Sequence, residues 1–314
     1  MLKYTLNRLL LAIPTLLLVS IIVFGLIRLI PGDPAQLMLG DLGDPVALER
    51  LRHAMGLDRP VAMQYLVWLG KVARGDFGVS ILQQRAVSEI LVSSLGVTAS
   101  LVLPAMLLAS LLAIPAGMLA AWRQNTAVDV GVVTLAIACL SIPSFWLGLV
   151  FLLVFGVWLD LLPVVGYVSL ADAPIEGMRY LLLPVCALAL IETGVIIRMA
   201  RASTIEVLRL EYVTHARAKG LGEATVAGRH VLKNAMAPTW TMIGLTLGSL
   251  LGGAVVIETV FTLPGLGRLM VDSIFARDYP VIQGCMLLVT AIYVIVNLLV
   301  ELCYPLLDPR VRPQ

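Results

Sequence analysis

The chain has 314 residues, of which 60% are hydrophobic and 13% are charged, and its formal net charge is only +2. Its mean hydropathy is +0.97. It contains continuous apolar stretches of roughly 20 residues, the length at which a helix crosses a bilayer. These values indicate a multi-span membrane protein and exclude an ordinary soluble domain. Nothing suggests binding to nucleic acid, because the basic residues lie beside apolar stretches and lack an aromatic stacking surface.

Six apolar stretches predict six transmembrane helices, and the expected fold class is therefore an all-α membrane protein. The second stretch contains Pro104 and Pro115, which predict kinks whose freed carbonyl groups bond to neighbouring helices or water. The third stretch is too long for one straight crossing and is interrupted between Ser141 and Trp146. The predicted spans are Leu9–Ile30, Gly96–Ala121, Val130–Trp158, Tyr180–Ala200, Thr239–Glu258 and Val281–Tyr304.

Basic residues in the short connecting segments predict the orientation of the chain. They gather near the amino terminus, between the second and third spans, between the fourth and fifth spans, and after the sixth span, so this side is expected to be cytoplasmic. Both termini then lie in the cytoplasm, while the loop that carries Asp172 and Glu176 faces outward. The residues that mark the cytoplasmic side are Lys3, Arg8, Arg123, the segment 201–238, Arg310 and Arg312.

The segment from Pro31 to Leu95 also faces outward, because at about 65 residues it is too long to follow the charge rule. Helical patterns at Val46–Met55 and Ala62–Ala73 predict a folded external cap. The expected organisation is a first span with this extracytoplasmic cap at 1–95, a transmembrane domain at 96–304 that contains a cytoplasmic loop at 201–238, and a cytoplasmic tail at 305–314.

The most polar part of the chain is the basic segment Arg201–Pro238, between the fourth and fifth spans. It holds two short helical patterns that meet just after Gly220, since glycine readily adopts the left-handed conformation beyond a helix end. Apolar residues recur every four positions on the first pattern, at Leu208, Tyr212 and Ala216. The segment is either a stiff elbow that receives a movement from a partner or an ordinary solvated loop.

No motif of a common catalytic site occurs in the sequence: GxxxxGK[ST], HExxH and GxSxG are all absent. The three histidines lie in polar segments, so no metal site is predicted. The four cysteines fall inside apolar stretches without a CxxC pair and are expected to be reduced. The chain is therefore not expected to be an enzyme, and any energy from ATP must arrive on another chain.

Charged residues inside the predicted spans are costly and are usually functional or paired. Glu192 lies near the middle of the fourth span, where it either lines a polar substrate path or bonds to a neighbouring helix. Glu258 and Glu301 lie near the ends of the fifth and sixth spans, and structural roles are expected for them.

Two further features of the spans concern helix packing and the path. Glycines four residues apart form a smooth stripe on the fifth span, which packs against a second subunit or within the same bundle. These glycines are Gly244, Gly248 and Gly252. Pro143 either opens backbone carbonyls to a water-filled path or makes an ordinary kink filled by aromatic side chains. The candidate residues of a translocation path are Ser141, Pro143, Ser144, Trp146, Glu192 and Met242.

The polar segment resembles the EAA loop of permeases from binding-protein-dependent ABC importers, in the dipeptide/oligopeptide/nickel branch. The matching run is Glu211-Tyr212-Val213-x-x-Ala216-Arg217-Ala218-Lys219-Gly220-Leu221, followed by Asn234-Ala235 and Pro238. Thr214-His215-Ala216 stands where the wider superfamily has Glu-Ala-Ala, and Pro238 lies further from the glycine than in sugar importers. Both departures are usual for this branch.

Further motifs of the same family follow one another in order along nearly the whole chain. Together they are highly specific, although each alone is weak. They are Pro31-Gly32-Asp33-Pro34, Gly56-Leu57-Asp58-Arg59-Pro60, Gly75-Asp76-Phe77-Gly78, Ile142-Pro143-Ser144-Phe145-Trp146, Glu258-Thr259-Val260-Phe261, Pro264-Gly265-Leu266-Gly267-Arg268, Arg277-Asp278-Tyr279-Pro280 and Asp308-Pro309-Arg310-Val311-Arg312.

The resemblance implies a type I ABC importer permease fold in the bacterial cytoplasmic membrane, in contact with membrane lipid. It implies a second, homologous permease subunit, two ATP-binding cassette ATPases and an extracytoplasmic solute-binding protein as partners, and no nucleic acid. ATP and Mg would be bound by the ATPases, and no cofactor by this chain. Arg217 or Lys219 would hold carboxylates of an ATPase. The implied coupling residues are Glu211, Tyr212, His215, Ala216, Arg217, Ala218, Lys219, Gly220 and Leu221.

Three other functions compete with an importer subunit. An ion-coupled secondary transporter needs a coupling-ion site, an intramembrane enzyme needs a mate for Glu192, and an assembly subunit of another membrane complex leaves the motif series unexplained. The substrate stays open among small peptides, nickel or other metal chelates and glutathione-like molecules. The short outer loop Asp160–Arg179 is more similar to the compact members of the family, which include nickel importers, than to the longer dipeptide permeases.

Overall fold

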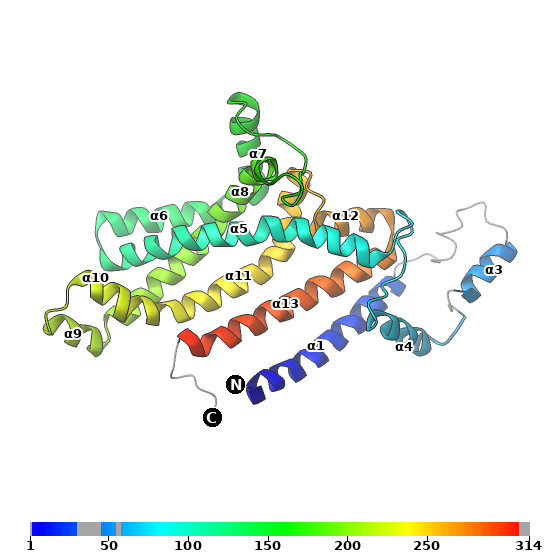
Figure 1. Ribbon diagram of the computed structural model, residues 1–314, viewed down its shortest axis with the longest axis horizontal. Coiled ribbons are helices and arrows are strands. Elements are labelled where there is room, and N and C mark those ends of the chain that lie inside the picture. The colour runs from blue at the N-terminus through cyan, green and yellow to red at the C-terminus, as the bar shows by residue number, and fades with distance from the viewer. Residues whose placement is uncertain (1, 30–44, 55–57, 308–314) are drawn as a thin grey trace. The chain divides into compact units, whose positions relative to one another are not determined.

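The computed structural model describes residues 2–29, 45–54 and 58–307, and in these ranges β-structure is limited to one isolated bridge between Val79 and Ala86. The remaining ordered elements are helices (Figure 1). They are α1 (Leu2–Leu29), α3 (Pro45–Ala54), α4 (Val61–Val72), α5 (Val87–Trp122), α6 (Ala127–Ser141), α7 (Ser144–Phe151), η1 (Leu152–Trp158), α8 (Pro174–Leu208), α9 (Glu211–Ala218), α10 (Glu223–Thr225), η2 (Val226–Val231), α11 (Leu232–Val260), α12 (Leu266–Ala276) and α13 (Tyr279–Leu307).

The chain packs as two compact units. The first unit consists of Met1–Leu6, Gly96–Arg268 and Ile292–Gln314, and the second consists of Asn7–Leu95 and Leu269–Ala291. Two of the family motifs, Pro31–Pro34 and Asp308–Arg312, lie outside the described residues, as do Met55, Gly56 and Leu57.

Four helical runs in the described ranges are long and apolar enough to cross a membrane, and a fifth crossing results if α6 and the following bent helix count as one. The described part of α1 contains a shorter apolar stretch, Ile13–Gly25. Five of the six apolar spans expected from the sequence fall on these four runs or on the bent pair, and the first, Leu9–Ile30, overlaps the described part of α1. The four runs are Val87–Trp122, Pro174–Leu208, Glu223–Val260 and Tyr279–Cys303.

These helices extend well beyond the apolar stretches that predicted them. The 35 residues of α8 correspond to about 52 Å of helix, compared with a hydrocarbon core about 30 Å thick. The 36-residue α5 continues through both Pro104 and Pro115. Apolar composition marks only the part of a helix that lies in lipid, whereas the backbone hydrogen bonds continue into the polar ends.

The helices differ from the sequence-based expectation in two places. The predicted stripe of Leu208, Tyr212 and Ala216 does not lie on one helix, because α8 ends at Leu208 and Leu210 is extended, with ψ of 140°, before α9 begins. A spacing of four residues continues across this two-residue turn, so periodicity alone does not reveal it. The short helix α12 was not predicted at all.

The core of the first unit is built around α8, which packs against α6, α7 and α11. Two glycines permit especially close crossings. A Cβ atom added to Gly117 of α5 would lie 2.8 Å from the Ala200 Cβ and 2.8 Å from the Ile197 carbonyl oxygen. A Cβ atom added to Gly194 of α8 would lie 2.6 Å from the Ala136 carbonyl oxygen on α6. The backbones of α5 and α6 therefore touch α8 directly.

The third predicted span is broken rather than kinked. The helical segments on either side of the break, Ala127–Ser141 and Ser144–Trp158, are bent by 95°. Ile142 is extended, with φ of −87° and ψ of 124°, and Pro143, with ψ of 138°, is the N-cap of the next helix. A residue before proline avoids the helical conformation, and proline has no N–H group to continue the helix. A 95° bend exceeds what one proline inside a continuous helix produces.

In the second unit, the buried side chain of Asp278 holds the loop that precedes α5. Its carboxylate accepts hydrogen bonds from the backbone N–H groups of Ile81 and Leu82, each at 3.2 Å, and from the hydroxyl group of Ser80. Because all of these donors lie in one loop, a single buried acid fixes its conformation.

The crossing at Gly194 gives the first testable expectation. We expect Gly194→Ala to lower the free energy of unfolding by roughly 1–3 kcal/mol, the usual cost of adding a methyl group to a filled interior. The matched control is Gly131→Ala on the neighbouring helix α6, where an added Cβ atom meets no heavy atom within 4 Å. Unfolding in detergent, followed by circular dichroism, measures both. Equal unfolding midpoints for the two variants would contradict the close crossing.

Candidate functional site

The polar segment between α8 and α11 folds into an elbow, by which we mean residues 209–231. Its first helix, α9, ends in a Schellman motif: the Gly220 N–H group donates to the Arg217 carbonyl at 2.9 Å, and the Leu221 N–H group donates to the Ala216 carbonyl at 3.3 Å. Gly220 has φ of +78°, a region in which any other side chain is strained. The bend of the elbow therefore depends on this glycine.

The inward face of α9 packs on the ends of the neighbouring helices. Six residues there form a buried apolar cluster: Val207, Val213, Ala216, Val226, Val231 and Ala235. The outward face is exposed and comprises Glu211, Thr214, His215, Arg217, Ala218, Lys219, Gly220 and Leu221. Of the candidate coupling residues, only Ala216 and the half-buried Tyr212 face inward, so these two side chains hold the elbow in place.

A polar cluster joins the elbow to the end of α5. The guanidinium of Arg217 donates two hydrogen bonds to the Glu223 carboxylate, at 2.8 and 3.1 Å. The Trp122 indole N–H donates to the same carboxylate at 2.9 Å, and the Arg217 guanidinium carbon lies 5.6 Å from the centre of the Trp122 ring. Arg217 is thus engaged within its own chain, so it braces the elbow.

The charge of Glu223, and with it the integrity of this cluster, depends on pH. The helical run Glu223–Val260 has 38 residues, about 57 Å of helix, so its polar first part extends outside a hydrocarbon core about 30 Å thick. There, hydrogen bonds from Arg217 lower the pKa of the exposed Glu223 carboxyl group, and this effect outweighs the opposing effect of desolvation. The carboxylate therefore keeps its charge at neutral pH, and the cluster is lost only as the pH falls through this lowered pKa.

A buried ion pair joins α6 to α8 just before the elbow. Arg201 donates to both carboxylate oxygens of Asp129, at 2.6 and 2.8 Å. The Asp129 side chain is 5% exposed and that of Arg201 is 26% exposed. The backbone N–H of Asn125 adds a third hydrogen bond to Asp129 at 2.9 Å. The geometry is bidentate, the strongest arrangement of an arginine and a carboxylate.

The other side of the elbow is closed against the start of α11. The amide of Asn234 donates to the Tyr212 hydroxyl at 2.6 Å and to the His230 carbonyl at 3.0 Å. The Tyr212 hydroxyl donates in turn to the same carbonyl at 3.3 Å. The elbow is therefore attached to α5 and α11 by polar contacts as well as by its apolar face.

At the far end of α11, the buried carboxylate of Glu258 organises the loop that leads into α12. It accepts hydrogen bonds from the Thr98 hydroxyl at 2.6 Å and from the Arg268 N–H at 2.9 Å. The Thr98 oxygen also accepts from the Leu266 N–H at 2.8 Å. Gly265 lies against this carboxylate with no room for a side chain. The geometry corresponds to a structural role for Glu258 as the cap of α12.

The residues expected to line a translocation path lie on α6, α7, α8 and α11, and these helices pack together. Ser141 and Pro143 flank the 95° break, and Trp146 is exposed on α7. Within the described ranges, no hydrogen bond joins any two of the six side chains, and Glu192 has no hydrogen-bond or ion-pair partner. The fold brings their helices together without joining their side chains into one site.

The glycine stripe of α11 faces α13 of the same chain over part of its length. A Cβ atom added to Gly248 would lie 2.7 Å from the Tyr293 ring, and Gly244 is in closer contact still with Val300. No heavy atom lies within 4 Å of the corresponding position at Gly252. The stripe therefore packs within this chain at two glycines and is open at the third.

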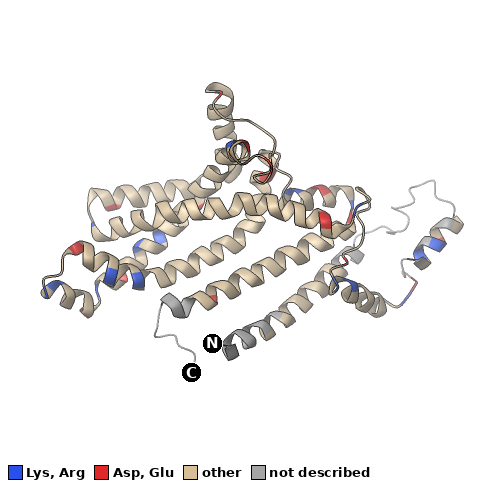
Figure 2. Ribbon diagram, viewed as in Figure 1, with Lys and Arg blue, Asp and Glu red and all other residues tan. Residues whose placement is uncertain are grey.

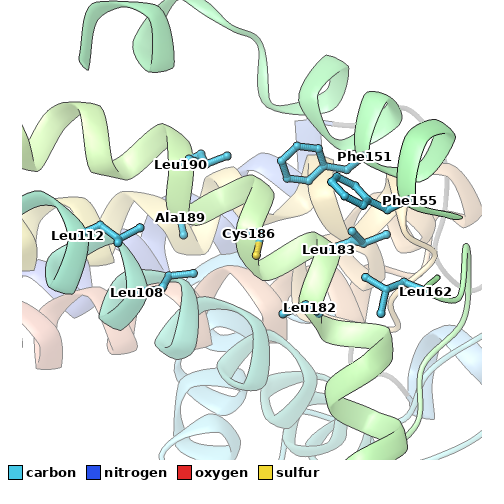
Figure 3. Close-up of a pocket in the computed structure, with 10 residues that line it drawn as sticks. All are labelled: Leu108, Leu112, Phe151, Phe155, Leu162, Leu182, Leu183, Cys186, Ala189 and Leu190. Carbon is cyan, nitrogen blue, oxygen red and sulfur yellow. The ribbon is translucent and has the colours of Figure 1, made fainter. Parts of the chain in front are cut away.

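A cavity of about 340 Å³ lies between α5, the α7–η1 helix and α8 (Figure 3). Its walls are entirely apolar apart from one thiol. The lining residues are Leu108, Leu112, Phe151, Phe155, Leu162, Leu182, Leu183, Cys186, Ala189 and Leu190. This lining offers no convergent polar groups that would orient a charged solute.

Comparison with known proteins decides the family. Residues 113–313 match the sequence model of a protein family described as "Binding-protein-dependent transport system inner membrane component". Residues 1–102 match the family model for the N-terminal part of such components. The chain belongs to this family. It is a permease subunit of an ABC importer and an inner-membrane protein.

Individual relatives of the permease cover almost its entire length. It is 42% identical to a peptide transport system permease protein of Brucella abortus, over 98% of each chain. It is 39% identical to a di/tripeptide transport system permease protein of Pseudomonas aeruginosa, over 100% of each chain. It is also 39% identical to the glutathione transport system permease protein of Escherichia coli, over 99% of each chain.

Several residues that shape the site of the permease were not found from the sequence. They are Trp122, Asp129 and Thr98. Asp129 had a usable signal, since an acid at the edge of an apolar span requires a partner, but that partner lies 72 residues away. Trp122 had no signal beyond its place at the end of an apolar stretch, and its contact is 101 residues away.

The buried ion pair predicts the effect of a small change. We expect Asp129→Asn to destabilise the permease by about 3 kcal/mol, because the charge of Arg201 is left largely buried without a counter-ion. The control is Glu89→Gln, which removes an exposed pair with Arg85 and should cost less than about 0.5 kcal/mol. Thermal unfolding of the purified permease measures both. A loss for Asp129→Asn as small as that of the control would refute the assignment.

Proposed function

We propose that the permease forms a membrane pathway together with a second homologous permease, and that two ATP-binding cassette ATPases and an extracytoplasmic solute-binding protein complete the importer. ATP and Mg are bound and ATP is hydrolysed by the ATPases, while this chain supplies a gate without a cofactor. The observation that carries the proposal is the braced elbow. It presents one exposed polar face, and its other contacts are used to attach it to three membrane helices.

The exposed face of α9 is the proposed contact with an ATPase. It includes Glu211, His215, Ala218, Lys219, Gly220 and Leu221. Ala218 and Gly220 allow close approach, and Lys219 is available to bind a carboxylate of the partner. Arg217 has a different role from the one implied by the family resemblance alone. Its pairing with Glu223 and its stacking on Trp122 support a bracing function.

A movement of this face reaches the pathway through rigid connections. Tyr212 bonds to the start of α11, the Arg217 cluster bonds to the end of α5, and Arg201 bonds α8 to α6. When the ATPases close on ATP, the elbow moves and these helices move with it, so that the pathway opens outward by alternating access. The importer then exchanges two arrangements of packed helices, and no step of bond chemistry occurs on the permease.

The proposed topology has six crossings, both termini in the cytoplasm and the type I importer fold. The crossings are α1, α5, α6 with α7–η1, α8, α11 and α13. Figure 2 supports the orientation: α5, α6, α8 and α11 carry few charges along their length, and Lys and Arg residues gather around α9 and α10. The division into 1–95, 96–304 and 305–314 follows from this topology, with the coupling loop at 201–238.

Within the pathway, we assign the polar lining to Ser141, Pro143, Ser144, Trp146, Glu192 and Met242. The 95° break leaves backbone carbonyl groups near Ser141 without helical partners, which suits a water-filled path. Glu192 is a partly buried carboxylate without a partner among the described residues, so it is free to interact with a cationic group of the solute.

The proposed substrates are short peptides, including glutathione-like molecules. The relatives that support this class are named for transport of peptides, di/tripeptides and glutathione. A peptide carries an ammonium group that suits Glu192, and the solute-binding protein supplies most of the selectivity. Nickel chelates, which the short outer loop favoured, have no support from these names.

A matched pair of glycine variants tests the coupling role. We expect Gly220→Val to strain the helix end by about 1–2 kcal/mol, and so to misplace the face presented to the ATPase. ATP hydrolysis by the reconstituted importer should continue, while solute uptake falls by roughly tenfold, the equivalent of 1.4 kcal/mol. Gly222→Val is the control, because Gly222 has φ of −63° and no heavy atom near the added Cβ.

The control should keep uptake and hydrolysis coupled. Membrane insertion of both variants is checked by their yield in the purified complex. Normal uptake by Gly220→Val would remove the coupling assignment.

Composition and substrate are tested on the purified complex. We expect the permease to co-purify with a second permease and two ATPases, and vesicles containing the complex and its solute-binding protein to accumulate labelled di- or tripeptides when ATP is present. Uptake should persist when ionophores collapse ion gradients, which distinguishes it from a secondary transporter. Accumulation of a nickel chelate without peptide uptake, or transport by this chain alone, would overturn the proposal.

A further inference from the structure

The helix α4, which precedes α5 in the second unit, packs on the C-terminal half of α1 (Figure 1). The Tyr65 hydroxyl lies 2.8 Å from the Ser20 hydroxyl. The ring of Phe24 lies 5.3 Å from that of Tyr65 and 5.4 Å from that of Trp68, measured between centroids. Ser20 and Phe24 are buried by these contacts.

These contacts fix the depth of α4 along α1. The first charged residue after Phe24 in the sequence is Arg28, and arginine is among the residue types found at the ends of crossing helices, near the membrane surface. At 1.5 Å per residue, Phe24 is about 6 Å and Ser20 about 12 Å below Arg28 along the helix. A helix that touches both residues lies at the level where the lipid headgroups meet the acyl chains.

The opposite face of α4 is apolar and exposed. Met63, Leu66 and Val67 follow one another at helical spacing on one side, with exposed fractions of 50%, 59% and 42%. The side of α1 that carries Leu18, Ile21 and Ile22 is also exposed and apolar. Both helices thus present apolar side chains that water alone would not favour.

The polar groups of α4 lie where a membrane-surface helix needs them. Gln64 and Lys71 are seven residues apart and share one side, separate from that of Leu66. Lys71 and Arg74 are exposed at the C-terminal end, where cations attract the phosphates of lipid headgroups. Tyr65 and Trp68 belong to the residue types enriched at this level of a bilayer.

We propose that α4 is an interfacial membrane helix, with its face of Met63, Leu66 and Val67 inserted among the acyl chains of the outer leaflet. The inference rests on the proposed topology, in which α1 crosses the membrane with its C-terminal end outward. The segment between the first two crossings is then partly embedded in lipid, rather than standing clear of the membrane as a cap.

Site-directed spin labelling tests the insertion in the assembled importer in lipid vesicles. In a background in which Cys139, Cys186, Cys285 and Cys303 are replaced by Ala, a nitroxide is attached at Leu66→Cys. Collision with oxygen reports lipid, and collision with a water-soluble nickel chelate reports water. We expect the label to lie about 5–10 Å below the phosphates, the depth of interfacial helices. Met63→Cys serves as a second site on the same face.

Two controls separate this inference from the topology beneath it. A label at Leu18→Cys in α1 should report the deep hydrocarbon, and a label at Gln83→Cys in the exposed loop before α5 should report water. Co-purification with the partner subunits confirms assembly of each variant. If the Leu18 label reports water, the topology fails and the inference fails with it.

If the Leu18 label reports lipid, two results would overturn the insertion of α4 alone. One is a Leu66 label as accessible to the nickel chelate as the label at Gln83, which means that the face is in water. The other is a Leu66 label shielded from both reagents, which means that a protein partner covers the face.

Discussion

The ion pair between Asp129 and Arg201 is the contact on which the arrangement of the polar end of the first unit depends. A buried arginine and a buried aspartate are each costly alone, and together they require the start of α6 and the end of α8 to stay in one register. Gly194 brings the backbones of α6 and α8 into direct contact along the same pair of helices. The pair thus converts two apolar helices, which lipid would allow to slide, into one rigid body.

This rigidity decides how the elbow works. A displacement of the elbow reaches the membrane helices only if the contacts between the elbow and those helices stay intact while it moves. The elbow has an apolar face buried against its own chain, a left-handed glycine that sets its bend, and polar bonds to α5 and α11. In the proposed importer the exposed side chains of α9 other than Arg217 contact an ATPase, because Arg217 is already paired with Glu223.

Much of this architecture could be predicted from the sequence, for physical reasons that also mark the limit. Apolar length located the membrane helices, since lipid imposes it directly on composition. Gly220 located the end of α9, because a backbone conformation demanded that residue. The pairing of Asp129 with Arg201, and of Trp122 with Glu223, depends on how distant segments meet, and no local pattern encodes it. The break between Leu208 and Glu211 could not be predicted, because the apolar spacing of four residues continues across it.

In the proposed topology the loop between α11 and α12 faces outward, so the buried carboxylate of Glu258 has a consequence for the binding of the proposed solute-binding protein. Thr98 and Arg268 donate hydrogen bonds to this carboxylate, and Leu266 is joined to it through the Thr98 oxygen. The loop between α11 and α12 is therefore ordered before a partner binds. A docking protein then loses little conformational entropy in ordering that surface. The association rate at this loop would then be set by diffusion and shape complementarity and not by a slow rearrangement of the loop. Repeated binding and release would therefore add little time to the transport cycle.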